Sequence, residues 1–281
     1  MTTSATIAVT GATGRLGGRV ARALAAEGRP QRLVVRRPEA APALPLSEVA
    51  SASYGDSAAS REALRGVETL FMVSGSESID RVSQHLSFVD AAAEAGVAHV
   101  VYTSFYAAAP DAVFTLARDH WSTEEHIRAS GMRWTFLRDN VYLDFMPMLA
   151  GPDGVIRGPA GAGRVSAVAQ DDIADVALAV LLNPERHVCR TYDLTGPEEL
   201  AMAEVAAILT AATGRVVSYH DETPEEAFAS RASYGAPDWL VEAWVSTYLA
   251  IAAGQQAGLS DCVEQITGHR PVGLRDLLAR P

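Results

Sequence analysis

The chain has 281 residues and 48% of them are hydrophobic, enough to form one large domain, or a large and a smaller one, around a sizeable core. The net charge of −11 argues against a general nucleic-acid-binding protein, which needs a basic surface. No apolar run is long enough to span a membrane, and residues 1–5 lack the charged and apolar regions of a signal peptide. We therefore expect a soluble, cytoplasmic protein that binds neither nucleic acid nor membrane.

Lysine is absent from the sequence, so all 23 basic residues are arginine. This absence excludes the phosphate clamp of a P-loop and the Schiff base of a pyridoxal enzyme, because both need a lysine amine. It also excludes the Tyr-x-x-x-Lys pair of ordinary short-chain dehydrogenases. The two cysteines, Cys189 and Cys262, lie far apart and the histidines show no ligand spacing, so we expect no disulfide framework and no metal site.

A glycine-rich turn follows the first predicted strand, Ile7–Thr10, and opens a helical pattern. The first glycine allows a sharp turn, the second allows backbone N–H groups to approach a pyrophosphate, and the third allows the helix to pack close to the sheet. The helix N-terminus offers N–H donors and the positive end of a dipole to the same anion. The pattern predicts a dinucleotide site rather than an ordinary strand-to-helix turn, with contributions from Gly11, Thr13, Gly14, Arg15, Leu16 and Gly17.

Two arginines, Arg36 and Arg37, follow the second predicted strand, residues 32–35. In an NAD site an acidic residue near this point bonds the ribose 2′-hydroxyl, whereas a guanidinium group suits a 2′-phosphate through planar, charge-assisted bonds. We therefore predict NADPH rather than NADH as the cofactor. The alternative is that one or both arginines, Arg37 before Arg36, are simply solvated.

Strands and helices continue to alternate up to residue 142. Further strands are predicted at 49–54, 99–102 and 133–137, and residues 66–73 are predicted to form a turn followed by a strand. Helices are predicted at 60–64, 81–95 and 120–130 between them. Such β-α units with short joints predict an α/β fold with a Rossmann-type, doubly wound parallel sheet. Because loops at the carboxyl ends of the strands line the ligand crevice of such a sheet, we assign Ser74, Thr103 and Asn140 to the cofactor site.

Asp56 stands between a predicted strand and a predicted helix. It either bonds the adenine amino group of the cofactor or caps the helix, and capping is the commoner role for an aspartate at such a place.

Past Tyr142 the pattern changes. Residues 147–163 are rich in Gly and Pro and are predicted to form a loop or hairpin, and most of the chain after residue 196 is helical. We expect residues 1–146, joined again by 164–195, to form the dinucleotide-binding domain. Residues 147–163 and 196–281 are expected to form a smaller, mostly helical substrate domain.

One helical stretch of this second domain carries Trp239, Trp244 and Tyr248. These side chains either form an aromatic wall for a planar acceptor or pack as the core of the small domain.

Several stretches resemble the NmrA-like branch of the atypical short-chain dehydrogenase/reductases, and within it the type 2 NADPH:quinone oxidoreductases and triphenylmethane reductases. The resemblance implies an NADPH-binding Rossmann domain with a small C-terminal domain closing a cleft over the nicotinamide. The branch contains both reductases and redox-sensing regulators, so it does not by itself decide catalysis. The stretches that carry the resemblance span nearly the whole chain: Ile7–Gly17, Val34–Pro38, Tyr54–Asp56, Leu64–Glu68, Tyr102–Ser104 and Ile266–Pro271.

The missing Tyr-Lys pair favours a reaction that places little demand on a general acid. It does not exclude ketones, because another side chain, a bound water or the substrate's own hydroxyl could donate the proton. A ketone that receives hydride becomes an alkoxide and needs a proton donor nearby, whereas a quinone becomes a stabilised hydroquinone anion. The missing pair therefore favours quinone-like, conjugated or cationic acceptors. The groups that we expect to orient the acceptor or supply the proton are His120, Tyr102, Ser104, Tyr106 and Tyr142.

For three of these residues a purely structural role is the alternative. His120, which the resemblance places where related reductases carry a catalytic lysine, is otherwise a helix histidine bonded to a neighbour. Ser104 otherwise satisfies the backbone at the end of a strand, and Tyr142 otherwise packs under the second domain.

We therefore expect an NADPH-dependent oxidoreductase that transfers hydride to a quinone or another planar aromatic carbonyl compound. One alternative is a ketoreductase that tailors a polycyclic polyketide. The other is a non-catalytic NADP(H) sensor that regulates a protein partner. Either a monomer or a homodimer fits the sequence.

Overall fold

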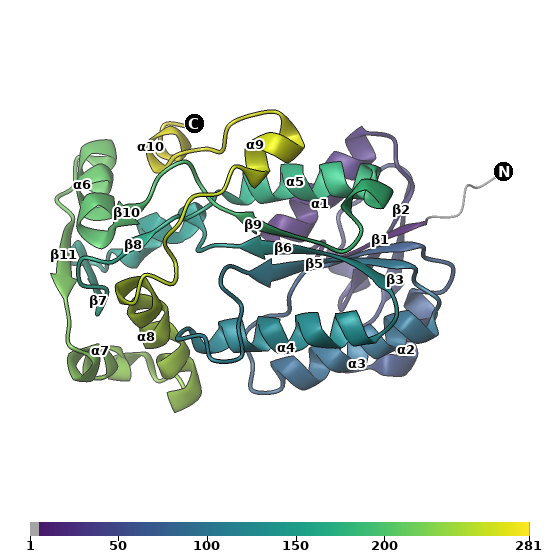
Figure 1. Ribbon diagram of the computed structural model, residues 1–281, viewed down its shortest axis with the longest axis horizontal. Helices are drawn as coiled ribbons and strands as arrows, with labels where there is room; N and C mark the ends of the chain where they lie inside the picture. The colour runs from purple at the N-terminus through teal and green to yellow at the C-terminus, as the bar shows by residue number, and fades with distance from the viewer. Residues whose placement is uncertain (1–5, 281) are drawn as a thin grey trace. The chain divides into compact units, whose positions relative to one another are not determined.

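The computed structural model describes residues 6–280, which divide into two compact units (Figure 1). Unit 1 comprises the chain up to residue 104 together with residues 121–138 and 173–192, and unit 2 comprises residues 105–120, 139–172 and the chain from residue 193 onward. Residues 1–5, where a signal peptide was not expected, lie outside the described residues, as does Pro281.

A seven-stranded sheet of order β3-β2-β1-β4-β5-β6-β9 forms the framework of unit 1. Strand β1 pairs in parallel with β2 on one side and with β4 on the other, so the strand order reverses at β1. This arrangement is the predicted doubly wound parallel sheet, in which the point of reversal is the usual place for a ligand. The strands are β1 (Ile7–Thr10), β2 (Gln31–Val35), β3 (Ser47–Ser51), β4 (Thr69–Met72), β5 (His99–Phe105), β6 (Arg133–Asp139) and β9 (Arg190–Leu194).

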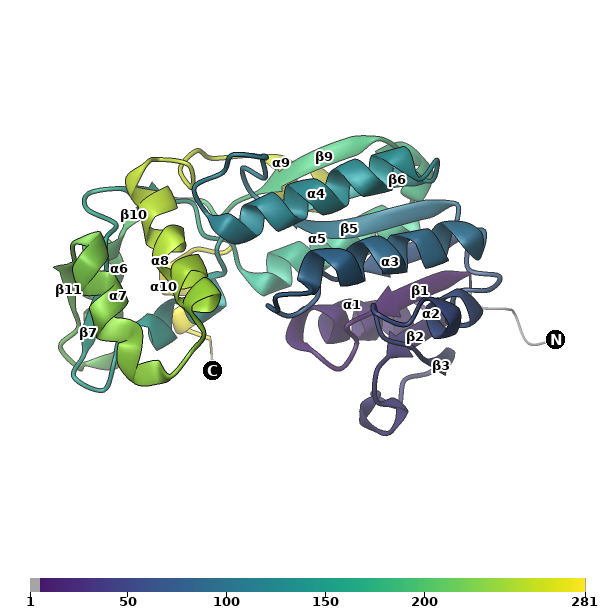
Figure 2. The same cartoon turned by 90° about the horizontal axis from the view of Figure 1, so that it is seen from below.

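Helices cover both faces of this sheet. Helices α1 (Arg15–Ala26) and α5 (Gln170–Leu182) lie on one face (Figures 1 and 2). Helices α2 (Ser57–Ala63), α3 (Arg81–Glu94) and the unit 1 part of α4 (Thr115–Ala129) lie on the other. Because both faces are covered, all four residues of β4 are buried, and three of them, Leu70, Phe71 and Met72, are apolar.

Helix α4 begins at Thr115, five residues before the predicted start at His120. The backbone N–H of Thr115 is satisfied by Ser246 Oγ at 3.2 Å, a partner 131 positions away that no local pattern reveals.

Unit 2 is built from short elements around its own core. Strand β7 pairs in parallel with β11, and β8 pairs antiparallel with β10. The predicted loop or hairpin at 147–163 thus contains β7, whose partner is a later strand and not the other arm of a hairpin. The main elements of unit 2 are η2 (Leu143–Leu149), β7 (Val155–Gly158), β8 (Arg164–Val165), β10 (Leu200–Ala201), α6 (Met202–Thr213), β11 (Ser218–Asp221), α7 (Pro224–Arg231), η4 (Ala232–Tyr234), α8 (Asp238–Ala252), α9 (Cys262–Thr267) and α10 (Leu274–Leu278).

The two units differ from the predicted domain boundaries at residues 105–120, 139–146, 164–172 and 193–195, all of which fall in unit 2. Hydrogen bonds within unit 2 account for part of the difference, since Val113 N–H donates to Gln255 Oε1 at 2.9 Å. Such bonds join segments more than a hundred residues apart, and the sequence carries no local sign of them. None of the helices within residues 6–280 is long and apolar enough to cross a membrane.

The turn between β1 and α1 supports a stability prediction. A Cβ atom added at Gly17 would lie 2.4 Å from the carbonyl oxygen of Gly11 and 2.6 Å from that of Thr10, and both contacts are with backbone. We expect Gly17→Ala to lower the free energy of unfolding by about 2 kcal/mol or more through overpacking. A Cβ at Gly55 meets only Gln84 Cγ at 3.6 Å, so Gly55→Ala is the matched control. Equal denaturant midpoints for the two variants would contradict the expectation.

Candidate functional site

The turn after β1 exposes the start of α1. Gly11 adopts a φ of +64°, a conformation that glycine takes without strain, and its carbonyl accepts a hydrogen bond from Gly14 N–H at 2.8 Å. Gly14 is the N-cap of α1 and no side chain caps the helix. The first-turn N–H groups are therefore available to an anion. Arg15 is exposed beside this turn, whereas Leu16 is 5% exposed and packs in the core.

A pocket of about 480 Å³ lies in unit 1 at the carboxyl ends of the strands, and we call it the unit 1 pocket. Arg36 is exposed at its wall, and no hydrogen bond or ion pair with any residue among 6–280 engages its guanidinium group. Arg37 is exposed too but does not line the pocket. The sequence-predicted residues that line the pocket are Gly11, Thr13, Arg36 and Ser74.

Two hydroxyl groups fix one wall of the unit 1 pocket. Thr10 Oγ1 lies 2.6 Å from Tyr54 Oη and accepts a hydrogen bond from Val73 N–H at 2.9 Å. Tyr54 donates to the Val73 carbonyl, and its ring stacks on Phe88 with 4.2 Å between centroids. Burial raises the pKa of Tyr54, so this phenol stays neutral.

The loop after β4 is fixed by three side chains. Ser74 N–H donates to Thr103 Oγ1 at 2.8 Å, Gly75 N–H donates to His85 Nε2 at 2.8 Å, and Arg81 Nε donates to the Gly75 carbonyl at 3.0 Å. Burial, followed by the charge of Arg81, lowers the pKa of His85 to about 3. The neutral imidazole can therefore accept the Gly75 N–H. Thr103, predicted to bind the cofactor, is 1% exposed and contacts this loop.

Asp56 caps helix α2, because its Oδ1 accepts a hydrogen bond from Ala59 N–H at 3.0 Å. The capping alternative is thus present in the structure, and Asp56 does not line the unit 1 pocket. Its binding to adenine stays a prediction.

Ser104 belongs to a buried charge cluster. It donates to Glu124 Oε1 at 2.6 Å, and the Glu124 carboxylate also accepts from Arg138 at 2.8 and 2.7 Å. Arg128 reaches the same carboxylate at 3.1 Å and lies over the Trp134 ring. The Glu124 side chain is fully buried, so these donors compensate its charge. The Ser104 hydroxyl thus bonds a carboxylate and not the backbone, and Glu124 was not predicted from the sequence.

The other predicted catalytic residues have different surroundings. Tyr102 is 0% exposed and lies edge-on to His85 and Phe136 in the core, and its catalytic role stays a prediction. Tyr106 donates its hydroxyl to the Ala257 carbonyl at 2.7 Å. His120 is 5% exposed, with its ring centroid 5.9 Å from that of Phe105.

Asn140, predicted to border the nicotinamide, is fully buried. Its Nδ2 donates to the Gln256 carbonyl at 3.0 Å and its Oδ1 accepts from Val141 N–H at 2.8 Å. Both ends of the amide are therefore occupied within unit 2.

Tyr142 is half-buried and donates its hydroxyl to Asp139 Oδ2 at 3.0 Å. Asp139 is 1% exposed, and burial raises its pKa well above the ordinary value although the hydrogen bond from Tyr142 opposes the shift. Tyr142 was predicted from the sequence to belong to the site, whereas Asp139 was not.

A second pocket of about 610 Å³ lies within unit 2, and we call it the unit 2 pocket. Trp244 and Tyr248 line it, while Trp239 on the same helix does not. Tyr248 also packs against the core of unit 2, and Trp244 against a small cluster around Val245, so both predicted roles are present. The aromatic and thioether side chains of the lining are Phe145, Met146, Met148, Met202, Tyr234, Trp244 and Tyr248.

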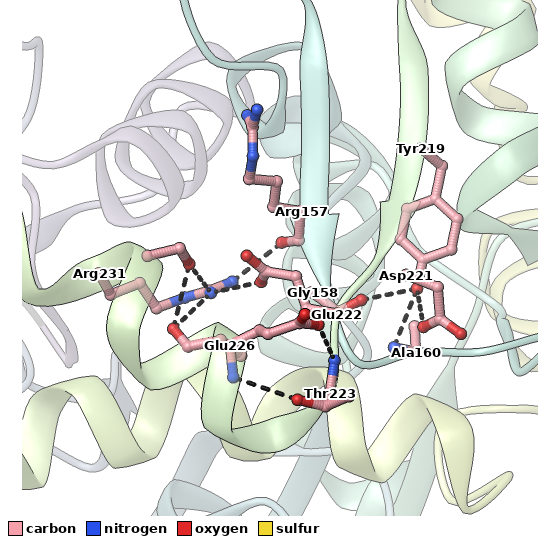
Figure 3. A network of polar contacts seen from close by, with 11 residues as sticks. Arg157, Gly158, Ala160, Tyr219, Asp221, Glu222, Thr223, Glu226 and Arg231 are labelled. Carbon is pink, nitrogen blue, oxygen red and sulfur yellow. Dashed lines mark hydrogen bonds and ion pairs between the residues drawn. The ribbon is translucent and has the colours of Figure 1, made fainter.

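Carboxylates neutralise the arginines of the unit 2 pocket (Figure 3). Arg231 donates to Glu222 at 2.9 Å and to the Arg157 carbonyl at 2.9 Å, and both side chains of the Arg231–Glu222 pair are at least nine-tenths buried. The Arg157 side chain points away from Arg231 and pairs with Asp153 at 2.6 Å. The pocket therefore combines an apolar lining with internally balanced charges.

No group of three or more His, Cys, Asp or Glu side chains that could hold a metal ion is found within residues 6–280.

The sheet, its glycine-rich turn and the unit 1 pocket define an α/β protein of the dinucleotide-binding class. Residues 3–262 match the NmrA-like family, and the chain belongs to that family. The predicted resemblance is therefore confirmed.

Its relatives span nearly the whole chain. An NAD(P)H azoreductase from Xenophilus azovorans is 34% identical, over 94% of this chain and 93% of its own length. The crystal structure of an NADPH-dependent quinone oxidoreductase from Escherichia coli, complexed with NADPH, is 31% identical with a TM-score of 0.89, over 97% of this chain and 98% of that one. The triphenylmethane reductase from Citrobacter sp., complexed with NADP(H), is 31% identical with a TM-score of 0.86 over the same shares.

The buried charge cluster supports a second stability prediction. Glu124→Gln removes the carboxylate that compensates Arg138 and Arg128, so we expect a loss on the order of 3 kcal/mol in the free energy of unfolding. Glu125 pairs with Arg128 too, but its side chain is 51% exposed, and Glu125→Gln should cost less than about 1 kcal/mol. Chemical denaturation of both variants measures the difference. A Glu124→Gln protein as stable as the Glu125→Gln protein would show that the cluster contributes little.

Proposed function

We propose that this chain is an NADPH-dependent reductase that transfers hydride to a quinone or another planar aromatic carbonyl acceptor in the unit 2 pocket. The observation that carries the proposal is the lining of that pocket, where aromatic and thioether side chains surround about 610 Å³. Such side chains give a flat ring a large, polarisable contact area. Glu222 and Asp153 neutralise the two arginines of the pocket lining, so these arginines do not favour an anionic acceptor over a neutral one. Membership of the NmrA-like family, with NAD(P)H-dependent reductases as relatives, supports the same class of reaction.

For the cofactor we propose NADPH, held in the unit 1 pocket. The uncapped first turn of α1 suits the pyrophosphate, and the free guanidinium of Arg36 suits the 2′-phosphate. Arg37 does not line the pocket, so we assign the 2′-phosphate to Arg36 alone. When bound, the nicotinamide supplies the hydride.

The chain's own residues bind and orient the acceptor and supply a proton. Ser104, Tyr106 and Asn140 are already engaged by Glu124, Ala257 and Gln256. We propose Tyr142, whose hydroxyl contacts Asp139 beside the unit 2 pocket, and His120 as the polar groups for the acceptor.

The cofactor assignment predicts a reversal of preference in one variant. In Arg36→Glu a carboxylate replaces the guanidinium, so NADPH affinity should fall at least about tenfold while NADH affinity is kept or improved. Arg37→Glu makes the same charge change outside the pocket lining, and we expect a change below about threefold. Fluorescence titration of both cofactors measures the affinities. Unchanged NADPH affinity in Arg36→Glu would contradict the 2′-phosphate assignment.

The acceptor assignment is tested by NADPH oxidation with a benzoquinone, a naphthoquinone, a polycyclic aromatic ketone and a triphenylmethane dye. We expect turnover of the quinones. Trp244→Ala should lower kcat/KM for naphthoquinone about tenfold, because the loss of an aromatic contact is worth about 1.4 kcal/mol. Trp239→Ala, on the same helix but outside the pocket, should change it less than about twofold. Tight NADPH binding without reduction of any acceptor would contradict the proposal and favour the NADP(H) sensor.

A further inference from the structure

We infer that Asp139 and Tyr142 act as a proton-donating pair for the acceptor, in which Tyr142 contacts the acceptor oxygen and Asp139 resupplies Tyr142. The inference rests on the proposed reductase function, since a carbonyl acceptor takes up a proton as well as a hydride. It assigns a reaction role to Asp139, a residue with no place in the sequence-derived site.

The first observation is the incomplete hydrogen bonding of the Asp139 carboxyl group. Asp139 is the last residue of β6 and is 1% exposed. Its Oδ2 accepts the Tyr142 hydroxyl at 3.0 Å, but no residue among 6–280 bonds Oδ1. A carboxylate can accept about four hydrogen bonds, but the Asp139 side chain accepts a single one from the residues among 6–280.

The second observation is that no positive charge compensates this carboxyl group. No arginine or histidine within the described part of the chain forms an ion pair with it, in contrast to buried Glu124, which Arg138 and Arg128 compensate. A buried, nearly unbonded anion is costly, whereas the neutral acid is not. Burial accordingly raises the pKa of Asp139 well above the ordinary range.

The groups around Asp139 do not reverse this conclusion. Tyr142, on the segment that follows β6, is the titratable side chain at the carboxyl group. Tyr106, at the end of β5, contacts only the Asp139 backbone, because its N–H donates to the Asp139 carbonyl at 2.9 Å. The neighbouring Asn140 amide bonds the Gln256 carbonyl.

The third observation is the position of Tyr142 beside the unit 2 pocket. Its ring centroid lies 5.5 Å from that of Phe145, and Phe145 lines the pocket together with Val141. Tyr142 is half-buried, so its ring is partly open to solvent. The pair therefore joins a buried acid to a phenol at the edge of an apolar pocket.

The proton balance of the step is simple. As the acceptor carbon receives hydride, the Tyr142 O–H bond breaks and an O–H bond forms on the acceptor oxygen. For this step Tyr142 turns its O–H from Asp139 Oδ2 to the acceptor oxygen, and the protonated Asp139 Oδ2 donates to Tyr142 Oη, so the 3.0 Å hydrogen bond reverses. The Asp139 O–H bond then breaks and its proton passes to the Tyr142 phenolate. Asp139 regains a proton from solvent after product release, so each turnover consumes one hydride and one proton.

The test compares acceptors that differ in their need for a proton. A ketone yields a basic alkoxide, a quinone yields a weakly basic hydroquinone anion, and a cationic triphenylmethane dye takes hydride and needs no proton. With Asp139→Asn and with Tyr142→Phe we expect kcat to fall roughly tenfold or more for an aromatic ketone, less for a naphthoquinone, and less than about twofold for the dye. A fall of equal size for all three acceptors would show a structural role and overturn the pair.

A second readout does not depend on turnover. At neutral pH, the infrared difference spectrum between wild type and Asp139→Asn should contain the C=O stretch of a protonated carboxyl group. A carboxylate band at Asp139 instead would overturn the inference. If the wild-type protein reduces no acceptor, the proposed function fails, while this spectrum still decides whether Asp139 holds a proton.

Discussion

Backbone N–H and C=O groups just past the ends of parallel strands have no hydrogen-bond partner in the sheet. Where such groups are buried, they need other hydrogen-bond partners. In unit 1, side chains from neighbouring elements supply the missing partners. Thr10 accepts from Val73, Thr103 accepts from Ser74, and His85 accepts from Gly75. The loops at this edge of the sheet are thus held in place, because each of these three backbone N–H groups donates to a side chain of another element. The neutral state of His85 is part of this arrangement, since a protonated imidazole could not accept the Gly75 N–H.

The distribution of paired and unpaired charges separates structural groups from those available to ligands. Glu124 and Arg231 are buried, and opposite charges compensate both of them. Arg36 is exposed at a pocket wall and unengaged by the described residues, while Asp139 is buried without a cation. An exposed free cation is suited to bind an anion, and a buried free acid is suited to hold a proton. Arg36 is therefore proposed to bind the 2′-phosphate of the cofactor, and Asp139 is proposed to supply a proton.

Local patterns were sufficient to predict the sheet, because the glycine-rich turn and the alternation of strands and helices are short-range features. They were insufficient wherever a partner lies far away in sequence. The roles of Tyr54 and His85 could not be predicted, since they depend on Thr10 and Gly75 at neighbouring strand ends. Tyr102 was selected as the last residue of a predicted strand, but the strand continues to Phe105 and the Tyr102 side chain is in the core. The early start of α4 and the parallel pairing of β7 with β11 were also not predicted, because both depend on partners that are distant in sequence.

The most direct test of the reductase assignment is a single-turnover experiment on protein-bound NADPH mixed with a naphthoquinone. The cofactor carries either hydrogen or deuterium at the transferred position of the nicotinamide. Loss of the NADPH absorbance with formation of one hydroquinone per NADPH, slower for the deuterated cofactor, is the expected result. Bound NADPH that persists in the presence of the acceptor would contradict hydride transfer and make this chain a binding protein for NADP(H) instead of a reductase.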